Sequence, residues 1–170
     1  MRPCGMHRQG FITDIIGFGQ HIALIGVSVA VVVDSAHYYR DTNIIQDSFG
    51  NTYHESFRFR PGIWNDFRYD AAYVVYNLNR SYSTFSADIV IAAGVHSNAE
   101  FIVEVTLDNN LTPVRSVDGI DVRTGSMPIE VDVSGVTTMT ITVRGGPGIR
   151  GIGTARGDVR LVNALLHNND

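Results

Sequence analysis

The sequence has no lysine, only one cysteine and no excess of positive charge. All 13 of its Lys and Arg positions are arginine, and the formal net charge is −4. Proteins that bind the phosphate backbone of DNA or RNA normally carry a basic patch, so we expect no nucleic-acid partner. Cys4 cannot form a disulfide within the chain, and cysteine usage therefore does not indicate a cellular compartment.

Sequence motifs of catalysis are equally scarce. His54-Glu55 is not followed by the second histidine of a zinc-protease helix, and no Gly-x-Ser-x-Gly nucleophile turn occurs. The glycine-rich run from Gly145 to Gly153 lacks the Gly-Lys-Ser/Thr ending of a phosphate-binding loop. We therefore predict a protein that is not an enzyme and needs no cofactor. Asp118-Gly-Ile-Asp121 fits either oxygen ligands for a structural Ca²⁺ or an Asp-Gly turn.

One apolar run, residues 22–33, stands apart near the N-terminus. It is shorter than the roughly 20 residues of a membrane-spanning helix, although residues 11–33 reach that length if Asp14 lies near the membrane edge. The run also suits the hydrophobic part of a secretory signal, and its β-branched second half suits a buried strand or a packing arm. We predict that residues 1–43 form an apolar arm or membrane-proximal segment plus a linker, outside the core.

From residue 44 onward the apolar residues alternate with polar ones. Phe101 and Val103, for example, lie two positions apart on one predicted strand and so share one face of it, as expected for a half-buried strand. Turn-forming groups such as Phe49-Gly-Asn51 separate these runs, and no long stretch has the period of a helix. The pattern predicts an all-β domain over residues 44–170, an antiparallel β-sandwich of the jelly-roll type.

The same alternation predicts which side chains face the core. We expect Glu104, Glu130, Asp132 and Thr142 to point outward from two packed sheets. The inward-facing positions that we predict are Tyr76, Leu78, Phe85, Phe101, Val103, Val131, Val133, Ile141 and Leu161.

A cluster of aromatic and planar polar side chains occupies residues 63–69. It holds Trp64, the only tryptophan, together with Asn65, Asp66 and Tyr69. Sugars are commonly bound in this way, with an apolar ring face stacked on an aromatic side chain and hydroxyls held by planar polar groups. Alternatively, the aromatic side chains close one end of the sandwich core. The sequence leaves both interpretations open.

Several motifs, taken in order, resemble the NPCBM-type carbohydrate-binding modules. Residues 76–85 are similar to the family's Tyr-x-Leu-x-x-x-Tyr-x-x-Phe core, and residues 47–53 are similar to its opening hairpin. Residues 129–136 and 139–143 look like its paired strands, and residues 158–161 look like its closing strand. The resemblance implies a jelly-roll sandwich of secreted or surface proteins, often attached to glycoside hydrolases, that binds sugars without cleaving them.

The chain departs from this family where the ligand site would be. The family's Gly-x-His-Ala segment before the Tyr-x-Leu strand is replaced by Arg68-Tyr69-Asp70, and its Asp-Trp pair before the last strand by Ala155-Arg156. Because function resides in the site and not in the fold, a rewritten site fits either an altered specificity or a domain reused for assembly.

Two functions follow from these observations as hypotheses. The first is a non-catalytic carbohydrate-binding or surface-adhesion module that holds a glycan or polysaccharide through Trp64, Asn65, Asp66 and Tyr69. Arg156 joins this set if the two loops share one end of the sandwich. The second is a structural or decoration subunit of a virion or cell-surface layer, whose N-terminal arm docks on protein neighbours. Both predict an extracellular or surface-exposed location, on a cell or on a virion.

Overall fold

The computed structural model describes most of the chain from residue 21 onward. Side chains are described from residue 40, and residues 21–23, 29–33 and 38–39 are described by their backbone alone. This described part contains no helix, and hence none that is long and apolar enough to cross a membrane. The full set of described residues is 21–23, 29–33, 38–61, 71–95, 97, 99–146 and 158–168.

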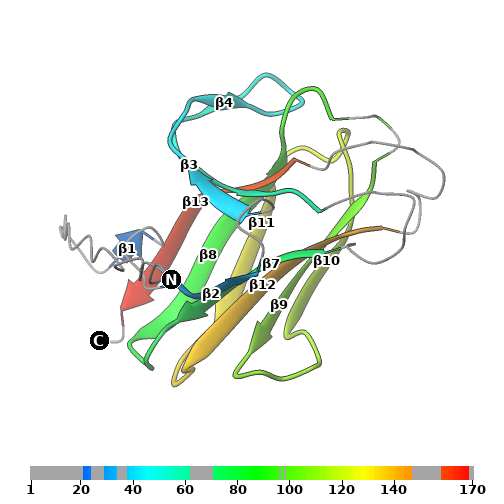
Figure 1. Ribbon diagram of the computed structural model, residues 1–170. Coiled ribbons are helices and arrows are strands. Elements are labelled where there is room, and N and C mark those ends of the chain that lie inside the picture. The colour runs from blue at the N-terminus through cyan, green and yellow to red at the C-terminus, as the bar shows by residue number, and fades with distance from the viewer. Residues whose placement is uncertain are drawn as a thin grey trace, which may run out of the picture.

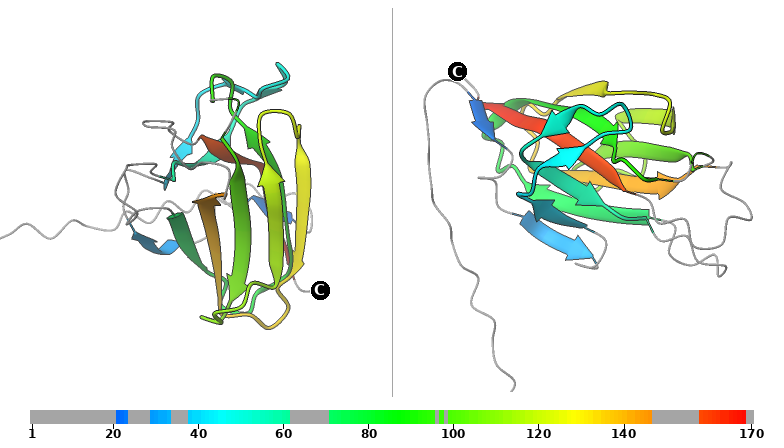
Figure 2. Two further views of the ribbon diagram at one scale, coloured as in Figure 1. Left: turned by 90° about the vertical axis from the view of Figure 1, so that its right-hand side faces the viewer. Right: turned by 90° about the horizontal axis from the view of Figure 1, so that it is seen from above.

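Antiparallel strands form two sheets that lie face to face (Figures 1 and 2). The first sheet has the order β11 (Met127–Asp132), β8 (Tyr82–Ile91), β13 (Val159–Asn168), β6 (Ser56–Phe59) and β3 (Tyr38–Asp41), and β1 (His21–Ala23) also pairs with β13. The second has the order β10 (Arg115–Ile120), β9 (Phe101–Leu107), β12 (Thr138–Gly145), β7 (Ala71–Asn77) and β2 (Val29–Val33). The predicted antiparallel β-sandwich is therefore confirmed.

The core lies between the two sheets and contains the predicted residues. Every residue that we predicted to face inward is buried, and none exposes more than 6% of its surface. Phe57 on β6 meets Tyr76 on β7 edge to face, with ring centroids 6.4 Å apart, so aromatic contacts link the two layers. The period-two pattern thus gave the correct register for the strands on which it was read.

The predicted outward positions lie on the opposite faces of the same strands. Glu130 and Asp132 are exposed on β11, while Glu104 and Thr142 are half-buried cross-strand neighbours on the outer face of the second sheet. Arg144 donates two hydrogen bonds to the Glu104 carboxylate, at 3.1 and 2.8 Å. This contact holds the pKa of Glu104 below its usual value, against the opposing effect of partial burial.

The expectation of paired strands over residues 129–136 and 139–143 is wrong. β11 pairs with β8 in the first sheet, whereas β12 lies between β9 and β7 in the second. Val131 and Ile141 therefore reach the same core from opposite layers. The connection between the strands includes Gly135, whose φ of +72° favours glycine, and it carries the chain from one sheet to the other.

Strands β1, β2 and β3 precede residue 44 and join sheets formed by the rest of the chain. β2 lies within the apolar run and pairs with β7, which agrees with the strand interpretation of that run. β3 pairs with β6, from Tyr38 opposite Phe59 to Asp41 opposite Ser56. The membrane-anchor interpretation also involves residues 11–20 and 24–28, which lie outside the described residues. The domain boundary between residues 43 and 44 remains a prediction.

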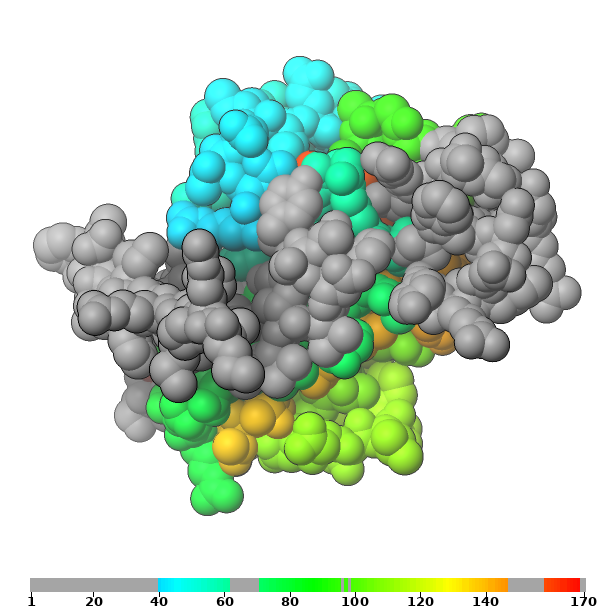
Figure 3. Space-filling view, in the orientation of Figure 1, coloured from blue at the N-terminus to red at the C-terminus, as the bar shows by residue number. Residues whose placement is uncertain are grey.

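A hairpin leaves the first sheet between β3 and β6 and covers part of its outer face. It consists of β4 (Ile45–Gln46) and β5 (Thr52–Tyr53), as expected for the opening hairpin. Ile45 packs there with Val90 and Val162 in a second, smaller apolar cluster outside the main core. The hairpin stands out on the surface in Figure 3, where it is cyan.

Candidate functional site

The segments that contain the predicted contact residues are bordered by strands that meet at one end of the sandwich. Phe59, which ends β6, pairs with Val159, which begins β13. Ala71, which begins β7, pairs with Arg144 near the end of β12. The β6–β7 and β12–β13 connections therefore leave and rejoin the sheets side by side. Because adjacent strands are antiparallel, the β8–β9 and β10–β11 connections lie at this end too, and we call it the loop end (Figure 1).

None of the predicted contact residues belongs to the described part of the chain. Trp64, Asn65, Asp66 and Tyr69 fall within residues 62–70, and Arg156 falls within residues 147–157; both segments lie outside the described residues. Their roles remain predictions. What the structure provides is the position of the strand ends on both sides of each segment.

The β4–β5 hairpin reaches the loop end and is fixed to it by backbone hydrogen bonds. The amide of Ser48 donates to the carbonyl of Ile91 at 3.0 Å, and the amide of Ala93 donates to the carbonyl of Gln46 at 2.9 Å. These bonds join the hairpin to the chain that follows β8. The hairpin therefore forms part of the frame of the loop end.

A buried carboxylate organises the turn of this hairpin. Asp47 is only 2% exposed, and its Oδ1 accepts hydrogen bonds from the amides of Phe49 and Asn51, both at 2.9 Å. Its Oδ2 accepts from Asn51 Nδ2 and from the Tyr53 hydroxyl. Burial alone would raise the pKa of Asp47, but these hydrogen bonds outweigh it and the pKa is lowered. Burial, followed by the bond to Asp47, raises the pKa of Tyr53.

The turn displays an aromatic side chain that we did not predict as a contact residue. Phe49 is 57% exposed although its backbone amide is held by Asp47. A Cβ atom added at Gly125, on the β10–β11 connection, would lie 3.7 Å from the Phe49 ring, at ordinary van der Waals distance, so the ring lies beside this connection. The sequence did predict a turn at Phe49-Gly-Asn51. An aromatic residue in a predicted turn was the signal from which Phe49 could have been proposed as a contact residue.

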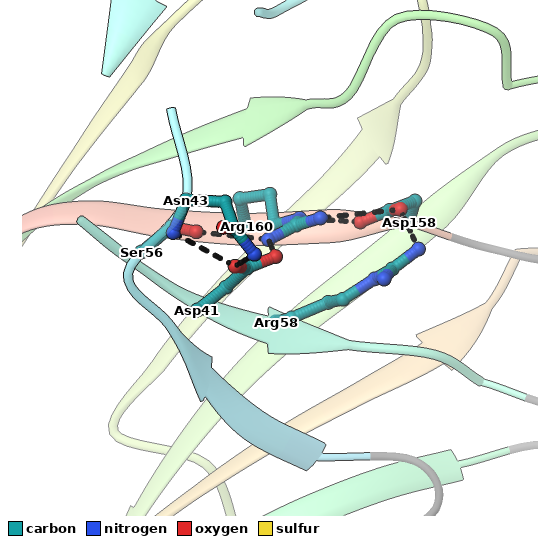
Figure 4. Close-up of polar contacts among 6 residues, drawn as sticks. All are labelled: Asp41, Asn43, Ser56, Arg58, Asp158 and Arg160. Atoms are coloured by element: carbon teal, nitrogen blue, oxygen red, sulfur yellow. Dashed lines mark hydrogen bonds and ion pairs between the residues drawn. The ribbon is translucent and has the colours of Figure 1, made fainter. Parts of the chain in front are cut away.

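A chain of alternating charges lies on the outer face of the first sheet, beside the start of β13 (Figure 4). Arg160 Nη1 donates to Asp41 Oδ2 at 2.8 Å and to Ser56 Oγ at 2.9 Å. Arg160 Nε donates to Asp158 Oδ1, and Arg58 Nη2 donates to the other oxygen of Asp158. The Arg160 side chain is only 5% exposed. We call Asp41, Ser56, Arg58, Asp158 and Arg160 the buried charge network.

The buried charge network has the features of a structural element and not of an acid–base pair. The hydrogen bond from Arg160 holds the pKa of Asp41 below its usual value, against burial, and Asn43 adds two further hydrogen bonds to the same carboxylate. A general acid at neutral pH would need a raised pKa instead. The network ties β3, β6 and β13 together immediately beside the loop end.

The described residues contain no group of three or more His, Cys, Asp or Glu side chains placed to hold a metal ion. Asp118 and Gly119 lie at an irregularity in the pairing of β10, where Gly119 has a φ of +69°. The Asp121 carboxylate accepts hydrogen bonds from the backbone and side chain of Arg123. The turn interpretation of this segment accounts for these contacts, and a structural Ca²⁺ remains untested.

Comparison with known families gives a match over the central part of the chain. A family model described as NPCBM/NEW2 domain matches residues 59–158, which is more than half of the 170 residues. The match runs from the end of β6 to the start of β13, and so includes both segments that carry the predicted contact residues. A search of curated proteins finds no match.

Several solved structures with a similar fold contain carbohydrate-binding modules. A structure of the CBM51-2 and INT domains of Clostridium perfringens ZmpB with GlcNAc has a TM-score of 0.64 at 14% identity, and covers 87% of this chain and 31% of that one. The CBM51 of Clostridium perfringens GH95 with methyl-galactose has a TM-score of 0.56 at 16% identity, and covers 86% and 99%. The tandem CBM51 modules of a Streptococcus pneumoniae family 98 glycoside hydrolase have a TM-score of 0.63 at 12% identity, and cover 88% and 48%.

These likenesses bear on the fold alone, because the identities are low. The chain spans less than a third of the solved ZmpB chain and about half of the tandem-module chain. None of the three is a virion or surface-layer subunit, so they lend no support to the assembly hypothesis.

Proposed function

The chain belongs to the NPCBM/NEW2 domain family, as its motifs predicted, and from this premise we propose that it is a non-catalytic module that binds carbohydrate. The observation that carries the proposal is the span of the family match, which includes both connections that border one another at the loop end. The similar solved structures, which are described as carbohydrate-binding modules, support it.

The contacts proposed for the glycan come from the two long connections at the loop end. Trp64 and Tyr69 offer aromatic faces on which the apolar face of a sugar ring stacks. Asn65, Asp66 and Arg156 offer planar groups that hydrogen-bond to pairs of neighbouring hydroxyls. The pairing of Phe59 with Val159 and of Ala71 with Arg144 supports this grouping, because it brings the borders of both segments together.

Phe49 is a further candidate contact at the same end. Its ring is exposed, while its backbone is held by the buried Asp47 carboxylate. A backbone fixed before the ligand arrives loses little conformational freedom on binding, which favours affinity. We therefore include Phe49 in the mutational test.

GlcNAc and methyl-galactose are the first ligands to test, because the similar CBM51 structures contain them. A module of this kind meets polysaccharides and glycoproteins outside cells, so an extracellular or cell-surface location is part of the proposal. Attachment to a longer protein is compatible with the small share of the ZmpB chain that this chain spans.

The test is binding of the full chain to a glycan array, followed by isothermal titration calorimetry with the glycans that bind. Trp64→Ala should weaken binding at least tenfold. The lost stacking contact is worth about 1 kcal/mol, and the hydrogen bonds to the sugar hydroxyls depend on the ring position that this contact sets. Leu111→Ala is the matched control, because Leu111 is 98% exposed on the β9–β10 connection, at the opposite end of the sandwich.

Two results would contradict the proposal. One is the absence of binding to any glycan on the array and to GlcNAc and methyl-galactose at millimolar concentration. The other is equal affinity of Trp64→Ala and Leu111→Ala, which would separate sugar binding from the loop end. Phe49→Ala then reports whether the hairpin takes part.

A further inference from the structure

A pocket of about 440 Å³ opens at the first sheet, and its lining includes none of the residues proposed to contact the glycan at the loop end. Its lining comes from Arg40 of β3, from the segment 52–57, and from Leu161 and residues 163–165 of β13. The volume lies within the range of small-molecule sites in proteins. The NPCBM/NEW2 match does not by itself assign it a role.

The pocket lies where the sheet is interrupted along one edge of β13. β6 pairs with β13 as far as Leu161, and β1 pairs with it from Leu165 onward. Among the described strands, none pairs with residues 162–164 on this edge. Asn163 at the centre of the interval has a φ of +52°, an unusual value for a residue other than glycine, and the register with β8 shifts here. Such bulges often occur beside binding sites.

The interruption gives the pocket an apolar floor and a polar rim. The base of the pocket is formed by Phe57, Leu161 and Ala164, which belong to the main core and are almost fully buried. The half-buried Leu165 beside them provides accessible apolar surface. The rim includes exposed Arg40 and Glu55, whose side chains form an ion pair at 3.0 Å. An apolar base surrounded by a few planar polar groups suits a ligand with one apolar face and several hydroxyls.

We propose that this pocket is a second carbohydrate site, which takes a single pyranose ring. The apolar face of the sugar lies toward the half-buried Leu165, beside Ala164, and adjacent hydroxyls bond to the Arg40 guanidinium and the Glu55 carboxylate. This inference rests on the proposed carbohydrate-binding function but uses none of the residues proposed to contact the glycan at the loop end. Two separate sites let one module hold two branches of a glycan, or two chains of a polysaccharide.

The ion pair on the rim has hydrogen-bonding positions to spare for a ligand. The Arg40 and Glu55 side chains are 44% and 51% exposed, and an ion pair this exposed contributes little to stability. Each group keeps unused hydrogen-bonding positions, since a guanidinium has five donors and a carboxylate has about four acceptor sites. A sugar that bonds to both therefore displaces water and leaves the fold unchanged.

The experiment is a ¹H–¹⁵N NMR titration of the full chain with GlcNAc, with methyl-galactose and with sorbitol, an acyclic polyol that lacks a ring face. We expect saturable shifts for the amides of residues 54–56 and 163–165 with at least one pyranose and none with sorbitol. Arg40→Ala and Glu55→Ala should each weaken that binding at least fivefold. Glu130→Ala, on an exposed position of β11, is the matched control and should leave it unchanged.

Trp64→Ala separates this inference from the proposed function. Shifts at the pocket that persist in Trp64→Ala support the second site. Shifts confined to the borders of the loop end, near Phe59 and Ala71, and lost in Trp64→Ala, would overturn the second site while leaving the proposed function intact. No saturable shift at residues 54–56 and 163–165 with either pyranose would overturn the second site, whereas the proposed function is decided separately by the glycan array. Equal shifts at the pocket with sorbitol would overturn the assignment of a pyranose.

Discussion

Replacement of Arg160 by methionine tests whether the buried charge network holds the sandwich together. Arg160 is 5% exposed at its side chain and donates to two carboxylates and one hydroxyl. Methionine fills much of the same volume but donates no hydrogen bond. The substitution therefore leaves the Asp41 carboxylate buried without its arginine.

The expected loss of stability depends on the hydrogen bonds that each carboxylate retains. Loss of one member of a buried ion pair costs about 3 to 5 kcal/mol, because the remaining charge is desolvated without compensation. Asp41 retains two hydrogen bonds from Asn43, and Asp158 retains Arg58. We therefore expect the lower end, about 3 kcal/mol, which is a large share of the 5 to 15 kcal/mol typical of a domain.

Arg144→Met is the matched control for this substitution. Arg144 also bonds to a carboxylate through two nitrogens, but its side chain is 43% exposed and that of its partner Glu104 is 20% exposed. Solvent screens this pair, so its loss should cost about 1 kcal/mol or less. The free energy of unfolding is measured by urea titration, with comparison at an unchanged slope.

Equal losses for Arg160→Met and Arg144→Met would refute the reasoning, because burial would then make no difference. An increase in stability for Arg160→Met would refute it as well, since it would mean that apolar packing more than replaces the network. Some buried ion pairs in other proteins do behave in that way when the whole set is replaced. Here only one member is changed, and its partners stay.

The remaining predictions concern the core, acid stability and the domain boundary. Phe85→Ala should lower the free energy of unfolding by about 3 to 5 kcal/mol in urea titration, because Phe85 is fully buried. Thr142→Ala, on the outer face, should change it by about 0.5 kcal/mol or less. Equal losses in the two variants would overturn the strand register. The lowered pKa of Asp47 means that its charged form stabilises the fold above its usual pKa of 3.8, and that this contribution is lost as the pH falls below that value. Asp47→Asn should therefore lower the urea midpoint at pH 7 and flatten its decline between about pH 4 and pH 2; an unchanged decline would show that the carboxylate is not responsible. A chain that begins at Tyr38 should have a higher urea midpoint than one that begins at Ile44, because only the former keeps β3; equal midpoints would support the boundary at residue 43.

The sandwich and its core could be predicted because each strand has one buried face. Val103 and Val105 alternate with the half-buried Glu104 between them only if the chain is extended and packed on one side, so the sequence itself defines the register. The partner of each strand could not be predicted in the same way. Residues 129–136 and 139–143 follow one another closely, yet β11 and β12 lie in opposite sheets, since a short connection serves equally well for pairing within a sheet and for crossing between sheets.

The buried charge network could not be predicted because its burial depends on distant segments. Arg58 alternates with Phe57 and Phe59, and the alternation alone places it on a solvated face. That face is covered because the chain between β3 and β6 folds over it, and Asp41 meets Arg160 across 119 positions of sequence. The contact residues Trp64, Asn65, Asp66, Tyr69 and Arg156 were identified by composition alone, and they remain predictions because they lie outside the described residues.

The position of the buried charge network predicts that substitutions in the β12–β13 connection leave the sandwich stable. Asp158 is the first described residue after the β12–β13 connection, and its carboxylate is held by Arg58 and Arg160. The border of that connection is thus fixed by side chains outside it. On the other side, Gly146 donates to the carbonyl of Glu100 at 2.7 Å. Because neither anchor uses residues 147–157, substitutions there, including Ala155-Arg156 in place of the family's Asp-Trp pair, should change specificity without a comparable loss of stability.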